Sequence, residues 1–125
     1  MTFTPNKTIL LAENDRSARE VTAMVLEAEG YRVVTTHNGT SALRILQDDD
    51  TVDVLLSDIS MPGGIDGIEL ARRVQMHWHI PIVLTSADPR SSFESFPDHV
   101  TFLPKPYDRR ALLAAVSGLP RPASA

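Results

Sequence analysis

The chain has 125 residues, enough for one domain with a substantial core and too few for two. Its 42% hydrophobic and 22% charged residues are ordinary for a globular protein, and the absence of cysteine excludes disulfides, a thiolate zinc site and a cysteine nucleophile. A net charge of −4, with apolar runs far below the ~20 residues that span a bilayer, predicts a cytoplasmic protein whose partners are neither nucleic acid nor membrane.

Short apolar runs alternate with amphipathic stretches along the chain, which is typical of strands and helices packed around a parallel sheet. Strands are expected at residues 9–12, 31–35, 52–57, 82–85 and 99–103. The third of these runs is almost wholly apolar, which indicates a central strand covered by helices on both faces.

Helices are expected between most of these strands. The first can be capped by Asp15 or Ser17 and ends near Gly30, and the others are expected at 40–47, 66–78 and 108–119. Their inward faces are expected to hold Ala18, Val21, Val25 and Ala28 in the first helix, Ala42, Leu43 and Leu46 in the second, Leu70, Ala71, Val74 and Trp78 in the third, and Leu112, Leu113, Val116 and Leu119 in the last.

The segment 88–98 breaks the alternation. It contains Pro89, Pro97 and three serines, and its only large apolar residues are Phe93 and Phe96. Proline lacks the backbone N–H that a helix needs, and serine competes for backbone hydrogen bonds. A long helix is therefore not expected here.

Polar side chains stand where the predicted strands end. Glu13 and Asn14 follow the first strand, Asp58 the third, Ser86 the fourth and Lys105 the fifth. Ligands of open parallel sheets bind at the carboxyl ends of the strands, so we expect these side chains to meet at one edge. Oxygen ligands suit a hard cation such as Mg²⁺, a carboxylate can accept a phosphoryl group, and a lysine with a hydroxyl can stabilise phosphoryl oxygens.

In this order, the motifs resemble those of the receiver domain of two-component response regulators, over residues 7–119. The residues that carry the resemblance are Glu13-Asn14, Asp58, Met61-Pro62, Asp66-Gly67, Ser86-Ala87 and Lys105-Pro106. The resemblance implies an α/β, flavodoxin-like, doubly wound sheet of five parallel strands in the order 2-1-3-4-5, with flanking helices. The composition of segment 88–98 makes the fourth helix of that fold short or irregular in this chain.

The resemblance also implies roles at the site. Asp58 accepts the phosphoryl group and Lys105 binds it. Glu13, Asn14, Asp58 and the backbone carbonyl of Ser60 bind Mg²⁺ or Mn²⁺.

Two more residues are implied in switching, and one peptide bond is implied to be cis. Ser86 supplies the switching hydroxyl, because in the family this residue directly precedes Ala or Gly, and Ala87 follows it here. Phe102 is the aromatic side chain that rotates on activation. The Lys105–Pro106 peptide bond is cis in the family pattern, which suits a tight loop that presents the ammonium to the site.

The sequence departs from the family pattern in three places. Asn14 stands where the family has a metal-binding aspartate, and the loss of one negative charge is expected to weaken Mg²⁺ binding. Gly63-Gly64 adds about one residue to the loop after the phosphoacceptor. The interval from Ser86 to Lys105 is about three residues short, roughly one helical turn, so the surface that reports phosphorylation is expected to be reshaped.

The expected function is a phosphorylation-dependent switch of a two-component system or phosphorelay, carried by a single domain over residues 1–125 with a flexible tail at 120–125. Its expected partners are a histidine kinase or histidine phosphotransfer protein and a downstream protein, and its expected state is a monomer or weak dimer. The alternative is a pseudo-receiver that binds partners without phosphorylation. Asn14 and the short fourth helical segment favour it, and the presence of Asp58, Ser86 and Lys105 opposes it. A phosphohydrolase would need a second general acid near Asp58, which the following residues lack, so a non-enzymatic phosphoacceptor is expected.

Overall fold

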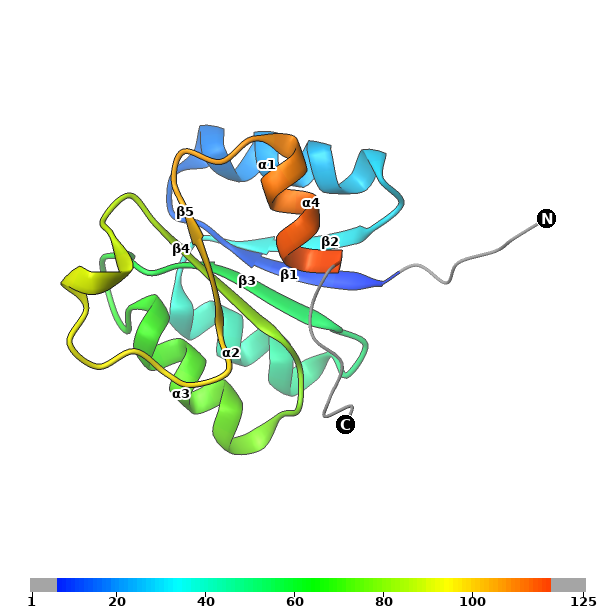
Figure 1. Cartoon of the computed structure of the whole chain (residues 1–125). Coiled ribbons are helices and arrows are strands. Elements are labelled where there is room, and N and C mark those ends of the chain that lie inside the picture. The colour runs from blue at the N-terminus through cyan, green and yellow to red at the C-terminus, as the bar shows by residue number, and fades with distance from the viewer. Residues whose placement is uncertain (1–6, 118–125) are drawn as a thin grey trace, which may run out of the picture.

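The computed structural model describes residues 7–117 and contains a five-stranded parallel sheet between two helical layers (Figure 1). The strands are β1 (Thr8–Ala12), β2 (Arg32–Thr36), β3 (Val54–Asp58), β4 (Ile82–Ser86) and β5 (Thr101–Pro104). Their order is β2-β1-β3-β4-β5, and every neighbouring pair is parallel, which confirms the predicted fold class and strand order. Each strand lies within two residues of its predicted bounds.

Helices cover both faces of this sheet. They are α1 (Arg16–Ala28), α2 (Gly39–Asp48), α3 (Gly67–His77) and α4 (Arg109–Ser117). The side chains of Asp15, Asn38 and Asp66 accept hydrogen bonds from backbone N–H groups in the first turns of α1, α2 and α3, so short polar caps begin these helices. Among residues 7–117, no helix has the length and apolar character needed to cross a membrane.

Two apolar clusters hold the helical layers to the sheet. Leu10, Leu55 and Leu84 face α2 and α3, whereas Leu11 and Leu56 face α1 and α4. Successive residues of one strand point to opposite faces, so the central strands contribute to both clusters. The third strand is a nearly continuous apolar run because helices cover both of its faces.

The inward face of α1 differs from the prediction. Val21 is 60% exposed and Ala28 is also exposed, whereas Thr22 and Leu26 are the buried residues of this helix. Val25 packs partly buried against the core as predicted, but the apolar pattern missed Thr22 because this buried position is a threonine. Its hydroxyl lies 3.0 Å from the hydroxyl of Tyr107, so burial does not leave it without a hydrogen bond.

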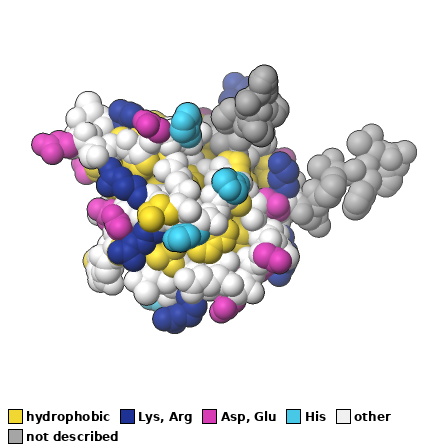
Figure 2. Space-filling model, turned by 90° about the horizontal axis from the view of Figure 1, so that it is seen from below, with side chains coloured by type: hydrophobic (Ala, Val, Ile, Leu, Met, Phe, Trp, Pro, Cys, Tyr) yellow, Lys and Arg dark blue, Asp and Glu magenta, His cyan; other side chains and the backbone are white. Residues whose placement is uncertain are grey.

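The connection from β4 to β5 contains a 3₁₀ turn at Arg90–Ser92 in place of a long helix, as expected. Two side chains of α3 hold it from one flank. Arg72 donates to the backbone oxygen and hydroxyl of Ser95, and Gln75 donates to the backbone oxygen of Asp98. On the side where α2 and α3 lie, hydrophobic side chains are visible at the surface between charged side chains and histidines (Figure 2).

The sequence-predicted closing helix ends outside the described residues. Its observed part, α4, buries Leu112 and Val116 as predicted. Leu119 lies outside residues 7–117.

Gly67, the first residue of α3, lies against the backbone of the loop that follows β3. A Cβ atom at this position would lie 2.1 Å from the carbonyl oxygen of Asp58 and 2.7 Å from the Cα of Ile59. Both neighbours are backbone atoms, which cannot turn away as a side chain could. Glycine at position 67 therefore allows α3 to begin directly beside Asp58.

We predict that Gly67→Ala lowers the free energy of unfolding by about 2–3 kcal/mol, because the added methyl group forces the backbone apart. Urea denaturation of the variant and of the wild-type protein measures the difference. Met76→Ala, at a 73% exposed position of the same helix, is the control for a general effect of alanine in α3. A Gly67→Ala variant as stable as the wild type would contradict the close approach.

Candidate functional site

The polar residues predicted at the strand ends do meet at one edge of the sheet. Glu13 follows β1, Asp58 ends β3 and Lys105 follows β5, and parallel pairing brings these three ends together. The backbone N–H of Lys105 donates to the carbonyl oxygen of Ser86 at 2.9 Å, which continues the pairing of β4 and β5 by one residue. The peptide bond between Lys105 and Pro106 is cis.

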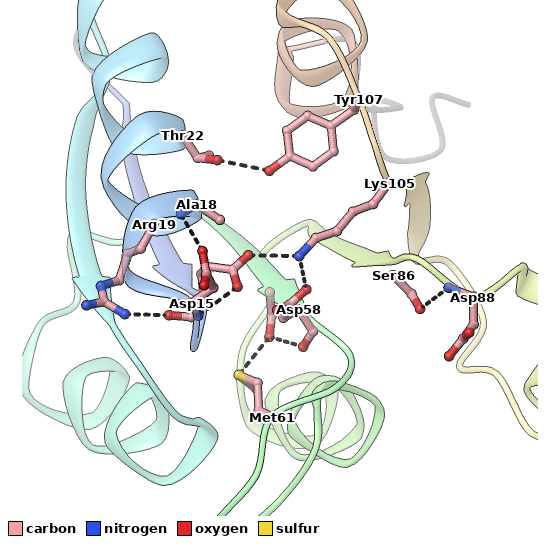
Figure 3. A network of polar contacts seen from close by, with 12 residues as sticks. Asp15, Ala18, Arg19, Thr22, Asp58, Met61, Ser86, Asp88, Lys105 and Tyr107 are labelled. Atoms are coloured by element: carbon pink, nitrogen blue, oxygen red, sulfur yellow. Dashed lines mark hydrogen bonds and ion pairs between the residues drawn. The ribbon is translucent and has the colours of Figure 1, made fainter.

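One ammonium group joins two buried carboxylates at this edge (Figure 3). Lys105 Nζ lies 2.8 Å from Asp58 Oδ1 and 3.1 Å from Glu13 Oε1. Asp58 is 5% exposed and Glu13 is 2% exposed. A buried carboxylate needs an opposite charge or hydrogen-bond donors, and here a single lysine serves two of them.

The remaining contacts of Glu13 fix its position. Its Oε2 accepts a hydrogen bond from the backbone N–H of Asp15 at 3.0 Å, and its carbonyl oxygen accepts one from the guanidinium of Arg19 at 2.8 Å. Both donors belong to the start of α1 or its cap. Glu13 is therefore bound on one side by α1 and on the other by Lys105.

The charges of this cluster alter its pKa values. Burial, followed by the neighbouring Glu13 carboxylate, raises the pKa of Asp58 to about 7, and the contact with Lys105 opposes that rise. For Lys105, burial alone would lower the pKa, but the ion pairs with Asp58 and Glu13 outweigh it and raise the pKa above its usual value. One ammonium cannot neutralise two carboxylates, so Asp58 is protonated at a higher pH than a free aspartate is.

Asn14 and Ser60 lie on the open side of Asp58. With its amide nitrogen turned toward the site, Asn14 donates to Asp58 Oδ2 and to the backbone oxygen of Ser60, both at 3.1 Å. The reverse orientation would set the amide oxygen against two other acceptors. The carboxylate oxygen and the carbonyl oxygen therefore converge on one point that a positive group prefers.

This donor set fits a magnesium ion. Mg²⁺ binds oxygen atoms, with one or two carboxylates and the rest water or phosphate. Asp58 and the Ser60 carbonyl supply two converging oxygens, and the Asn14 amide can turn to supply a third that carries no charge. Glu13 is already bound to Lys105 and to the N–H of Asp15, so its charge acts from beside this point.

Ser86 and Phe102, the predicted switch residues, lie on the side of the β4–β5 connection. The Ser86 hydroxyl accepts a hydrogen bond from the backbone N–H of Asp88 at 2.9 Å. Asn14, Ser60 and Ser86 line one hollow of about 610 Å³. Phe102 is half-buried and packs edge-on against Phe96, with ring centroids 5.9 Å apart.

The sequence did not reveal the contact between Thr22 and Tyr107, which lies beside Lys105 (Figure 3). A tyrosine directly after Lys105-Pro106 and a threonine among apolar helix positions were the available signals. Neither residue predicts the other without the fold. His77 is the last residue of α3, and His79 lies beyond the end of this helix.

The raised pKa of Asp58 predicts a pH dependence of stability. The folded protein keeps a proton on Asp58 up to about pH 7, whereas the unfolded chain releases it near the ordinary value of 3.8. Stability from this group is therefore full at low pH and is lost as the pH rises through 7. Without divalent cations, we expect the free energy of unfolding to fall by about 2–3 kcal/mol between pH 5 and pH 8.

Asp58→Asn is the matched variant for this measurement, because it removes the titrating proton and leaves the four histidines in place. Urea denaturation at several pH values should show a smaller fall in stability for the variant than for the wild type. Equal slopes for the two proteins would contradict the raised pKa.

Comparisons with known proteins agree with this geometry. The family model of the response regulator receiver domain matches residues 9–117. Transcriptional regulatory protein CpxR of Escherichia coli K12 is 36% identical over 119 residues, which cover 90% of this chain and 49% of that protein. Transcriptional regulatory protein CseB of Streptomyces coelicolor is 30% identical over 118 residues, with the same two coverages. The chain thus spans about half the length of these curated relatives.

Solved structures give the same result. The receiver domain of the hybrid histidine kinase CckA has a TM-score of 0.75 and 35% identity, and the match covers 90% of this chain and 97% of that one. The chemotaxis response regulator CheY4 of Vibrio cholerae has the same fold, with a TM-score of 0.84 at 24% identity over 93% of this chain and 100% of that chain. The strand order, the acidic site with its lysine and these matches together show that the chain belongs to the response regulator receiver domain family.

Proposed function

We propose that Asp58 is the phosphoacceptor of a phosphorylation-dependent signalling switch. Receiver domains of response regulators serve phosphorylation-based signalling and interact with histidine kinases and downstream effectors. The observation that carries the proposal for this chain is the contact of 2.8 Å between Lys105 Nζ and Asp58 Oδ1, with Glu13 buried beside both. This arrangement supports a role in which the Asp58 carboxylate gains a phosphoryl group while the positive charge of Lys105 stays beside it.

The proposed chemistry is phosphoryl transfer from a phosphohistidine of a kinase or phosphotransfer protein. A carboxylate oxygen of Asp58 forms a bond to phosphorus, the phosphorus–nitrogen bond of the donor breaks, and the imidazole leaves with its electron pair and is protonated. Lys105 provides positive charge to the phosphoryl oxygens, whose negative charge must be stabilised as the bond forms. Hydrolysis of the acyl phosphate returns Asp58 to the carboxylate.

Magnesium bound at this site would neutralise part of the charge on the phosphoryl oxygens. Asp58, the Ser60 carbonyl and the Asn14 amide oxygen are the groups of this chain that would hold it. Glu13 adds negative charge nearby and keeps Lys105 oriented through their contact of 3.1 Å.

Ser86 connects the site to the β4–β5 connection. Its hydroxyl holds the N–H of Asp88 at 2.9 Å in this structure. A phosphoryl group on Asp58 offers strong acceptors, and we propose that the Ser86 hydroxyl turns to donate to it, as in the family pattern. The Asp88 N–H then loses its acceptor, and the connection that includes Phe93 and Phe96 changes its partner-binding surface.

We predict that incubation with Mg²⁺ and a phosphorylated histidine kinase or a small acyl phosphate adds the mass of one phosphoryl group to the protein. Asp58→Asn should abolish this gain, because the amide is a poor nucleophile for the reaction. Intact-mass spectrometry measures both proteins.

Asp50→Asn is the matched control, because Asp50 lies in an exposed acidic turn and the same charge is lost away from the site. It should gain mass like the wild type. A wild-type protein that gains no mass with several donors would contradict the proposal and favour the pseudo-receiver, which binds partners without phosphorylation. An Asp58→Asn variant that is still phosphorylated would contradict the assignment of the residue.

We predict that Asn14→Asp binds Mg²⁺ about tenfold more tightly than the wild type, because it restores a negative ligand where the wild type has a neutral amide. Isothermal titration calorimetry measures both affinities. Asn38→Asp is the control: it adds the same charge at the cap of α2, where aspartate replaces asparagine without loss of the capping bond. Equal Mg²⁺ affinities for wild type and Asn14→Asp would show that position 14 does not limit metal binding.

A further inference from the structure

A pair of hydroxyl groups links α1 to the segment that follows Lys105. Thr22 Oγ1 and the Tyr107 hydroxyl oxygen lie 3.0 Å apart, from residues far apart in the sequence (Figure 3). Thr22 is 5% exposed, and burial raises the pKa of the Tyr107 phenol. Neither residue belongs to the polar cluster that the family resemblance identifies.

The space around this bond is poorly filled. A hollow of about 430 Å³ lies between α1 and the end of β5, lined by Ala18, Val21, Thr22, Ala87, Lys105, Pro106 and Tyr107. The Tyr107 ring packs against the apolar cluster that includes Leu26 of α1, but the hollow leaves Lys105-Pro106 without close packing against this helix. Among residues 7–117, the hydroxyl pair joins α1 to Tyr107 itself, and an ion pair between Arg109 and Glu29, the C-cap of α1, joins the same helix to the start of α4. The hydroxyl pair is the nearer of the two contacts to Lys105 in the sequence.

Lys105 needs such a restraint. Its four-carbon side chain is flexible, and part of it lines the same hollow. The ammonium is held at its far end by Asp58 and Glu13, and the Lys105 N–H is held by the Ser86 carbonyl oxygen. On the side of α1, the hollow leaves the segment that begins at Lys105 without close neighbours. The hollow also offers space into which the side chain could turn.

The other end of the link is rigid. Thr22 stands in the middle of α1, and the cap of this helix, Asp15, donates its backbone N–H to Glu13 Oε2. Arg19 of the same helix donates to the Glu13 carbonyl oxygen. The hydroxyl pair thus connects the helix that positions Glu13 to the segment that positions Lys105.

We propose that Tyr107 is a positioning residue for Lys105, and that it acts through its hydrogen bond to Thr22. The bond fixes the segment after β5 at the distance from α1 at which the Lys105 ammonium reaches both carboxylates. Its importance for signalling rests on the proposed function, but its effect on the position of Lys105 does not.

The first test observes Lys105 directly, in the unphosphorylated protein. The chain contains two lysines, Lys7 and Lys105, so lysine labelled with ¹³C and ¹⁵N gives two side-chain NMR signals. Lys7 is exposed and serves as the internal reference. Tyr107→Phe and Thr22→Val each remove one hydroxyl and keep the shape of the side chain, and both should move the Lys105 signal toward that of Lys7.

Thr22→Ser keeps the hydroxyl and should keep the wild-type signal. Tyr31→Phe is the matched control, because it removes a phenol hydroxyl that makes no hydrogen bond within residues 7–117 while the ring stays in the cluster beside α1. The double variant Thr22→Val/Tyr107→Phe should move the signal no further than either single variant. An unchanged Lys105 signal in Tyr107→Phe, or an equal change in Tyr31→Phe, would overturn the proposal.

The second test measures binding of beryllofluoride, an analogue of the phosphoryl group, with Mg²⁺. Loss of the hydroxyl pair should weaken binding about fivefold in Tyr107→Phe and in Thr22→Val, the effect typical of one hydrogen bond, with no loss in Thr22→Ser or Tyr31→Phe. Wild-type binding in both hydroxyl-deleted variants would overturn the positioning role. If the wild type binds no beryllofluoride while the Lys105 signal moves as expected, the proposed function fails and the positioning of Lys105 stands.

Discussion

The site depends on one interaction, in which the single ammonium of Lys105 contacts two buried carboxylates. Lys105 is the one ammonium that contacts both Glu13 and Asp58 in the described part of the chain, so the cluster would carry one excess negative charge if both acids were ionised. Burial, together with the neighbouring Glu13, raises the pKa of Asp58 to about 7, and the Asn14 amide can bind Asp58 and the Ser60 carbonyl oxygen only with its nitrogen facing them. A proton, an amide or a divalent cation can each satisfy the same oxygen atoms, which makes the site responsive to its surroundings.

Sheet topology brings these groups together without any special loop. Glu13, Asp58 and Lys105 each follow or end a strand, and the parallel order β2-β1-β3-β4-β5 places those ends on one edge. The helices then adjust the geometry from both faces. On one face α1 binds Glu13 through the N–H of Asp15, and on the other Gly67 lets α3 start against the backbone of Asp58. One helix start thus fixes the Glu13 carboxylate, and the other lies against the backbone of Asp58.

Much of this could be predicted from the sequence, because strand runs and strand-end polar residues are local signals. The fold class, the strand order implied by the family resemblance, the cap of α1 at Asp15, one of two candidates with Ser17, and the missing long helix after β4 follow from patterns of a few residues. Asp66, expected as the first residue of its helix, is instead the cap that precedes it. The burial of Thr22 in α1 does not follow from such patterns, because its partner lies 85 positions away along the chain. The orientation of the Asn14 amide likewise depends on two acceptors brought near by folding. The periodicity of apolar residues predicts which residues share a face of a helix or strand. It does not predict contacts between segments that are distant in the sequence.

The connection between β4 and β5 is fastened to α3 by exposed polar contacts from Arg72 and Gln75. Water can replace such contacts at small cost, whereas detaching a packed amphipathic helix would uncover its whole apolar side. Phe93 and Phe96 also pack against the core on this face, so the connection is anchored by two aromatic side chains and otherwise by contacts that water can replace. The stretch between these anchors can therefore shift without uncovering a helix, and the bond from the Asp88 N–H to the Ser86 hydroxyl ties its start to the acidic edge of the sheet.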